Sequence, residues 1–143
     1  MNLMQHLVVE IVRQRGLQPA FNQSAEFHLR LDNPPYLPLV IERQGLIISV
    51  AHYGELNGDA IRDPELTFRW PDWVPTSITQ DPVGRYAEAL SVVDGRTMVR
   101  PRLLRDLRSF ANTWARNLRH QGFANPAIRA SSLTHAGLLQ PTP

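Results

Sequence analysis

The chain has 143 residues, of which 43% are hydrophobic and 20% are charged, a composition typical of a single folded domain. All 15 basic side chains are Arg, because the sequence contains no Lys, and it contains no Cys either. This composition excludes a Schiff-base or P-loop Lys, a thiol nucleophile, a disulfide and a thiolate metal site. The net charge of +2 combines an acidic part and a basic part, since residues 1–95 carry 7 Arg against 12 acids and residues 96–143 carry 8 Arg against Asp106 alone.

The first segment has the periodicity of an amphipathic helix. Its apolar residues recur at spacings of three and four and include Leu3, Leu7 and Ile11, and Gly16 is a natural end for such a helix. The segment has no early basic cluster, and Glu10 interrupts its apolar run, so it does not resemble a signal peptide. We therefore expect a soluble, cytoplasmic protein with no membrane association.

The middle of the chain predicts a mostly antiparallel meander of about five strands, after a connector at residues 19–24. Residues 25–31 alternate between apolar and polar side chains, as a half-buried strand does. The other expected strands are at residues 37–42, 46–53, 65–70 and 73–80. Residues 54–63 are expected to form a polar loop, and residues 85–93 either a strand or a short helix. Asp94-Gly95 predicts a tight hairpin turn that leads to a strand at residues 97–99.

The last predicted element is a long amphipathic helix that begins at Pro101 and ends near Gly122. Apolar side chains from Leu103 to Leu118 recur at helical spacing and predict one buried face. The opposite face carries five arginines: Arg102, Arg105, Arg108, Arg116 and Arg119. Residues 124–143 are expected to be a flexible tail, with some helix at residues 133–139.

These elements predict a two-layer α+β domain over residues 1–123. The links between strands are too short for the crossover helices that parallel strands need, so the sheet should be antiparallel. One face of the sheet would pack against the N-terminal and C-terminal amphipathic helices.

The stretch from Pro34 to Phe68 carries a resemblance to a known family. It contains Ile-Ser-Val-Ala-His-Tyr, then Asn-Gly-Asp, then Arg-Asp-Pro-Glu-Leu-Thr-Phe, and the likeness continues from Arg100 to Phe123. The chain resembles an uncharacterised domain-of-unknown-function family encoded on plasmids and integrative conjugative elements of proteobacteria. The resemblance implies a mobile-element accessory protein, and it implies no catalytic residue.

The first candidate site is an acidic loop. If the strands on either side pair as a hairpin, the loop brings an imidazole, a phenol and three carboxylates to one end of the sheet. Its residues are His52, Tyr53, Asn57, Asp59, Asp63 and Glu65. Such groups can bind a divalent cation or act as acid and base, although the spacing matches no zinc pattern and no calcium loop. The alternative is that Asn-Gly-Asp is a turn and that Glu65 pairs with Arg62 or Arg69.

Two further surfaces are candidates for binding. The Arg face of the last helix can neutralise phosphates, or it can be an ordinary solvated face whose arginines pair partly with the acidic half of the chain. Trp70 and Trp73, on either side of Pro71-Asp72, can form a protein-binding hot spot or can anchor the sheet to a helix. The serines lie in no nucleophile elbow.

From these features we expect a non-enzymatic binding module from a mobile element, without a cofactor or metal. Its most concrete form is an inhibitor of a host defence complex, similar in action to an anti-CRISPR protein, with a protein partner. One alternative is a nucleic-acid-binding accessory protein that uses the Arg-rich helix. The other is a metal-dependent hydrolase built on His52, Asp59, Asp63 and Glu65.

Overall fold

The structure is a computed structural model, and it describes residues 2–133 and 139–141. Three α-helices, one 3-10 helix and ten strands are present in this part of the chain. In chain order the elements are α1 (Leu3–Gln14), α2 (Gln18–Gln23), β1 (Glu26–Asp32), β2 (Leu39–Gln44), β3 (Ile47–Leu56), β4 (Asp59–Arg69), β5 (Pro75–Gln80), η1 (Asp81–Val83), β6 (Arg85–Glu88), β7 (Leu90–Val93), β8 (Arg96–Val99), α3 (Pro101–His120), β9 (Arg129–Leu133) and β10 (Leu139–Pro141).

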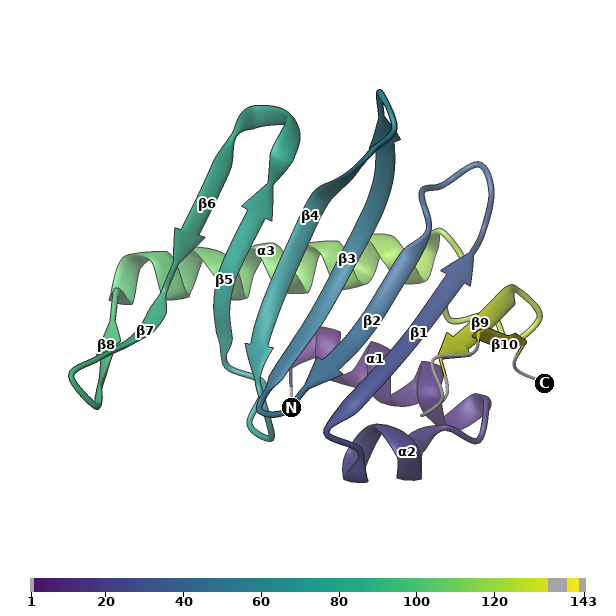
Figure 1. Cartoon of the computed structure of the whole chain (residues 1–143), viewed down its shortest axis with the longest axis horizontal. Coiled ribbons are helices and arrows are strands. Elements are labelled where there is room, and N and C mark those ends of the chain that lie inside the picture. Colours follow the sequence, from purple (N-terminus) through teal and green to yellow (C-terminus); the bar gives the residue numbers. More distant parts are fainter. Residues whose placement is uncertain (1, 134–138, 142–143) are drawn as a thin grey trace.

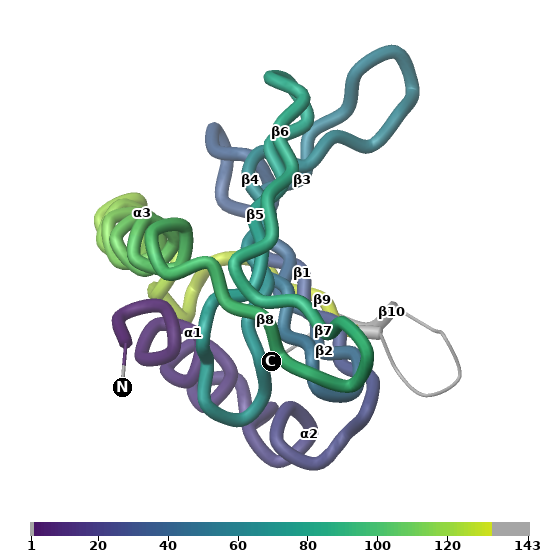
Figure 2. Tube along the Cα trace, turned by 90° about the vertical axis from the view of Figure 1, so that its left-hand side faces the viewer, coloured from purple at the N-terminus to yellow at the C-terminus, as the bar shows by residue number. Residues whose placement is uncertain are grey.

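Eight of the strands form one antiparallel sheet in the order β10-β9-β1-β2-β3-β4-β5-β6. Helices α1 and α3 lie against one face of this sheet, and neither of them lies against the other face, which we call the open face (Figures 1 and 2). The two-layer α+β class predicted from the sequence is therefore confirmed. The predicted number of about five strands was too small, because the sheet has further members on both sides of the meander.

The alternation of side chains along the strands builds the core. An apolar row crosses five neighbouring strands through the paired residues Leu29, Ile41, Val50, Leu66 and Ile78, and all five side chains are fully buried. Because successive strand residues point to opposite faces, the next row is polar and faces the open side. That row runs through His28, Glu42, Ser49, Thr67 and Ser77.

The two predicted helices pack on the apolar row as their sequence patterns indicate. Helix α1 buries Met4, Leu7 and Ile11, and its first turn is capped by the Asn2 side chain, which accepts a hydrogen bond of 2.7 Å from the amide of Gln5. Helix α3 buries a face centred on Trp114. Since helix–helix and helix–sheet contacts cover these faces, both helices are held by packing as well as by intrinsic propensity.

Of the two tryptophans of the Trp-Pro-Asp-Trp segment, Trp73 lies in the core and the partly buried Trp70 packs against it, as the anchoring alternative predicts. The Trp73 side chain is only 1% exposed and contacts Phe68, with 5.2 Å between ring centroids. Trp70 contacts Phe21 of α2 edge-to-face at 5.6 Å. Their role as a free protein-binding hot spot therefore finds no support in the packing.

Residues 19–24, expected to be a connector, lie mostly in the short helix α2, which spans residues 18–23. It has no helical periodicity of its own, and one buried side chain, Phe21, holds it against the core. The guanidinium of Arg43 also fixes its end, donating hydrogen bonds of 2.8 Å to the carbonyl oxygens of Phe21 and Asn22. Tertiary contacts of this kind override a weak local pattern.

The C-terminal segment also differs from the expectation. Residues 124–143 were expected to be a flexible tail, but β9 pairs antiparallel with β1 in a register that sets Leu31 opposite Ala130, and β10 pairs with β9. Ala130 is 4% exposed, so β9 contributes to the core. Most of the helix expected at residues 133–139 lies outside the described residues, whereas Leu133 and Leu139 belong to β9 and β10.

The segment at residues 85–93 is extended throughout and changes partner at Ala89. Strand β6 pairs with β5, and the last hydrogen bond between them runs from the Ala89 amide to the Thr76 carbonyl. Strand β5 begins only one residue earlier, at Pro75. The next strand, β7, therefore has no strand of the large sheet to pair with. It pairs instead with β8 across the predicted Asp94-Gly95 turn, in which both residues have positive φ. The resulting β7–β8 hairpin projects from the body of the molecule (Figure 1).

None of the helices in the described part of the chain is long and apolar enough to cross a membrane.

Candidate binding surfaces

The five arginines of the predicted basic surface are all exposed on α3. A rotation of 100° per residue places Arg102, Arg105 and Arg116 within an arc of about 60° at the centre of the solvent face. We call these three residues the Arg crest. Arg108 and Arg119 lie on the flank of the helix that faces α1, on either side of Asn112, whose side chain accepts a hydrogen bond from the Leu3 amide.

The flank and the crest differ in their ionic partners. Arg119 donates to the Glu10 carboxylate of α1 at 2.6 Å, so this arginine joins the two helices. Arg108 borders a hollow of about 300 Å³ between α1, α3 and the β4–β5 turn. No carboxylate of the described residues forms an ion pair with an Arg of the crest. The five arginines of the predicted face therefore differ in role. Arg119 links α3 to α1, Arg108 borders the hollow, and the three arginines of the crest face solvent.

The expected acidic loop is largely a β-hairpin. Strands β3 and β4 continue to Leu56 and Asp59 and are joined by Asn57-Gly58, where φ is 53° and 83°. Positive φ at both central residues is the requirement of the tightest hairpin turns, and Asn-Gly meets it with little strain. The hairpin leans away from α3 (Figure 2) and carries the exposed side chains of Asn57 and Asp59 at its tip.

His52 lies on the opposite face of the sheet from Tyr53 and Glu65. It continues the buried alternation of Ile48 and Val50, and its ring packs against Trp114 and Phe123 with 5.6 Å between centroids in each case. Its Nδ1 lies 3.3 Å from the Pro38 carbonyl oxygen, and burial lowers the pKa of the imidazole. His52 thus packs against the core aromatics, and the structure does not bring it together with Glu65, although the charge of Asp63 acts on its ring.

Glu65 lies on the open face and has two partners. One carboxylate oxygen accepts a hydrogen bond of 2.6 Å from the Ser49 hydroxyl, and the other lies 3.4 Å from the Arg62 guanidinium. The pairing with Arg62 was one of the two alternatives; Arg69 instead pairs with Asp72 at 2.6 Å.

A bulge makes the Arg62–Glu65 pair possible. In a regular strand, residues three apart point to opposite faces, but the register with β3 shifts between Arg62 and Glu65, which leaves an extra residue at Asp63-Pro64. Both side chains therefore reach the open face, where Arg62 also binds Asp81 at 3.2 Å. Tyr53 lies on this face too, and burial, followed by the charge of Glu65, raises the pKa of its phenol.

The six residues of the predicted acidic site are thus divided among four places. Asn57 and Asp59 lie at a hairpin tip, Asp63 is exposed at the bulge, Tyr53 and Glu65 lie on the open face, and His52 is on the helix side. In the described residues no group of three or more His, Asp or Glu side chains is arranged to hold a metal ion.

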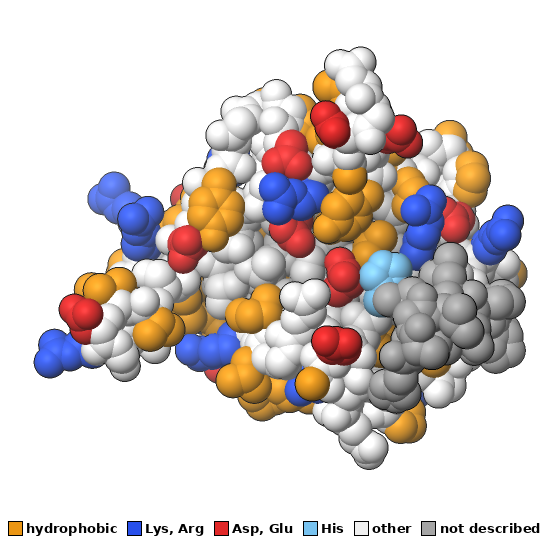
Figure 3. Space-filling view, in the orientation of Figure 1, with side chains coloured by type: hydrophobic (Ala, Val, Ile, Leu, Met, Phe, Trp, Pro, Cys, Tyr) orange, Lys and Arg blue, Asp and Glu red, His pale blue; other side chains and the backbone are white. Residues whose placement is uncertain are grey.

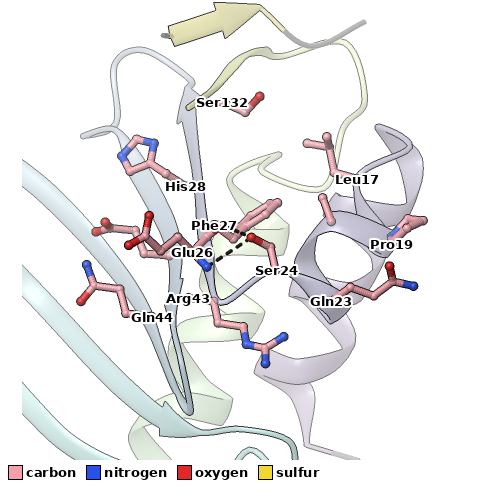
Figure 4. Close-up of a pocket in the computed structure, with 12 residues that line it drawn as sticks. Leu17, Pro19, Gln23, Ser24, Glu26, Phe27, His28, Arg43, Gln44 and Ser132 are labelled. Atoms are coloured by element: carbon pink, nitrogen blue, oxygen red, sulfur yellow. Dashed lines mark hydrogen bonds between the residues drawn. The ribbon is translucent and has the colours of Figure 1, made fainter. Parts of the chain in front are cut away.

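Sequence reasoning missed a hollow beside α2. It has a volume of about 620 Å³ and is bordered by α2 and by the start of β1 and the end of β2 (Figure 4). Glu26 and His28 of β1, together with Glu42 and Gln44 of β2, are among its polar side chains. Burial raises the pKa of the Glu42 carboxyl, against a smaller opposing effect of His28. The sequence signal for this hollow was the row of polar side chains in the alternating residues 25–31. The hollow itself could not be located from the sequence, because its position depends on how β1 pairs with β2.

The β7–β8 hairpin is the second surface that the sequence did not single out. All of β8 and the last two residues of β7 are exposed, including Val92, Val93, Met98 and Val99. In the space-filling view the hairpin is a projection with hydrophobic side chains on it (Figure 3). The Asp94-Gly95 turn was predictable, but the lack of a covering element was not.

One family model matches the chain, over residues 6–124, and its description is a domain of unknown function (DUF6908). No curated protein and no solved structure matches the chain.

Proposed function

Because the chain belongs to the DUF6908 family, whose function is unknown, we propose a function from its surface: a non-enzymatic binding module that contacts nucleic acid through the Arg crest of α3. The observation that carries the proposal is that three exposed arginines lie along one line of the helix without a carboxylate partner among the described residues. An Arg guanidinium binds phosphate oxygens in a bidentate manner and stays charged at any physiological pH.

The dimensions of the crest suit a nucleic-acid backbone. From Arg102 to Arg116 the helix rises by about 21 Å, which is the length of about six base pairs of a duplex. The side chains between them on the same face, Ser109 and Thr113, are small and can donate hydrogen bonds to phosphate. Nothing in the crest resembles a base-reading motif, so binding would depend little on base sequence.

The test is a fluorescence anisotropy titration of the whole chain against a labelled DNA duplex and a labelled single strand. Three neutralised phosphates predict an affinity that falls roughly 40-fold between about 50 and 200 mM salt. Replacement of Arg102, Arg105 and Arg116 by Glu should abolish binding. The matched control reverses the same number of exposed charges elsewhere, at Arg13, Arg85 and Arg129, and should retain it. Equal loss in both variants, or no binding by the native chain at low salt, would contradict the proposal.

A second candidate is inhibition of a host defence complex by a protein of mobile-element origin. It is favoured by the two surfaces of opposite sign, the Arg crest on one side and the acidic β3–β4 hairpin leaning away from it. Such a protein would compete with nucleic acid at the complex. A competition experiment distinguishes the two, because an inhibitor releases nucleic acid from its target complex and is affected by Asp59→Arg as well as by changes in the crest.

We do not propose a metal-dependent hydrolase. The groups that it needs are divided between the two faces of the sheet, with His52 packed against Trp114 and Glu65 on the open face.

A further inference from the structure

We propose that the β7–β8 hairpin is a dimerisation arm, which pairs edge-to-edge with the same hairpin of a second copy of this chain. This inference does not depend on the proposed nucleic-acid contact, because it rests on residues of β7 and β8 and on none of the Arg crest.

The hairpin exposes several apolar side chains. Four of the twelve exposed large hydrophobic residues in the described part of the chain lie on it, and these are Val92, Val93, Met98 and Val99. Val92 is 73% exposed, and Met98 is 52% exposed. A two-stranded hairpin with no covering layer has little stability by itself, and a soluble monomer seldom exposes a contiguous apolar patch of more than a few hundred Å². A partner that covers the hairpin would both stabilise it and remove its apolar side chains from water.

The hydrogen-bonding pattern shows which groups of β8 are free. In a hairpin closed by a two-residue turn, the residues next to the turn exchange both backbone bonds, so Val93 pairs in this way with Arg96. The alternation then directs the backbone groups of Met98 and Arg100 toward β7, which agrees with the bond from the Arg100 amide to the Ala89 carbonyl. The amide and carbonyl groups of Thr97 and Val99 therefore point outward along an unpaired edge.

This edge is complementary to itself. A two-fold axis at Thr97 sets Thr97 against Thr97 of the second copy, with two backbone hydrogen bonds, and cross-strand Thr pairs are favourable. The same register sets Arg96 of each copy opposite the uncharged Met98 of the other, so no two like charges face each other directly along β8. A symmetric contact of this kind closes at two copies.

The first test is sedimentation equilibrium of the whole chain across a range of concentrations, with circular dichroism as the check on folding. The native chain should approach the mass of a dimer. Thr97→Lys sets two like charges against each other at the axis and places Lys on the edge strand, so its dissociation constant should rise at least tenfold. The control Thr113→Lys makes the same change at an exposed position of α3 and should dimerise as the native chain does.

A second test fixes the register. Because the chain has no Cys, a Thr97→Cys variant carries a single thiol. Hydrogen-bonded antiparallel residues have Cα atoms about 5.5 Å apart, which lies within the range of about 4.4–6.8 Å that a disulfide spans. Mild oxidation should therefore link Thr97→Cys into covalent dimers, and should leave Thr113→Cys mostly monomeric. A monomeric native chain at all concentrations, an open-ended series of oligomers, or equal cross-linking of the two Cys variants would overturn the proposal.

Discussion

The buried guanidinium of Arg43 offers the most direct test of how the lower edge of the fold is held. The side chain is 8% exposed, lies 3.9 Å from the centre of the Trp70 ring, and donates to the carbonyl oxygens of Phe21, Asn22 and Gly45 at 2.8–2.9 Å. It satisfies two carbonyls of α2 that no further helical turn can reach. We predict that Arg43→Met destabilises the protein strongly although it retains most of the apolar stem.

The magnitude follows from these contacts. A hydrogen bond from a charged donor contributes about 1.5–3 kcal/mol when it is buried, as the bond to Phe21 is. The two part-buried bonds contribute about 1 kcal/mol each, since water can replace the donor in part. The loss in the free energy of unfolding should thus be about 4 kcal/mol. With a urea dependence of about 2 kcal/mol per molar, the midpoint should fall by about 2 M.

Urea unfolding followed by tryptophan fluorescence measures this shift. Arg43→Lys serves as a second variant, because it keeps the charge but loses the planar guanidinium and its stacking on the ring. Its urea midpoint should lie between those of the native chain and Arg43→Met. The control Arg30→Met removes an exposed arginine whose pair with Asp32 at 3.1 Å is solvated, and it should cost under about 1 kcal/mol. If Arg43→Met loses less than about 1 kcal/mol, the guanidinium does not hold α2 as inferred.

Two further predictions concern the open face and the core. Burial raises the pKa of Glu42 above its ordinary value of 4.5, so the folded state binds this proton more tightly than the unfolded state, and the contribution of Glu42 to stability falls as pH rises through that range. Glu42→Gln should therefore be more stable than the native chain at neutral pH, and the two melting curves should converge on acidification below 4.5; a constant difference would contradict burial as the cause. Trp73→Ala removes a fully buried ring and should cost about 3–5 kcal/mol in urea unfolding, whereas a surface tryptophan would cost little.

Periodicity located the main elements of the fold but not their neighbours. The two long helices and the inward face of the strands followed from spacing alone, since Leu29, Ile41 and Val50 obey a simple alternation. Strand β9 could not be predicted in this way, because it is extended only through its pairing with β1, which lies at the far end of the sequence. A short helix such as α2 likewise depends on a contact with Arg43 that no local pattern records.

In the candidate sites, too, local patterns predicted some features, whereas others depend on contacts between distant segments. The solvent side of α3 was predictable because helical geometry fixes it, but the pairing of Arg119 with Glu10 depends on how α1 and α3 meet. The place of His52 was contained in the alternation after Ile48 and Val50, and it was overlooked because the residue type suggested chemistry. The bulge at Asp63-Pro64 had a sequence signal as well, since Pro within a strand is found mainly at bulges and edges.

The pairing of β1 with β9 has a consequence for the order in which the molecule is assembled. Leu29 and Ser132 are partners although about a hundred residues separate them, whereas β2 to β5 form contacts between near neighbours in sequence. Closing so long a loop costs chain entropy before any contact offsets it. The meander can therefore form early and offer the edge of β1 as a template, on which β9 pairs late in folding and from which it separates early in unfolding.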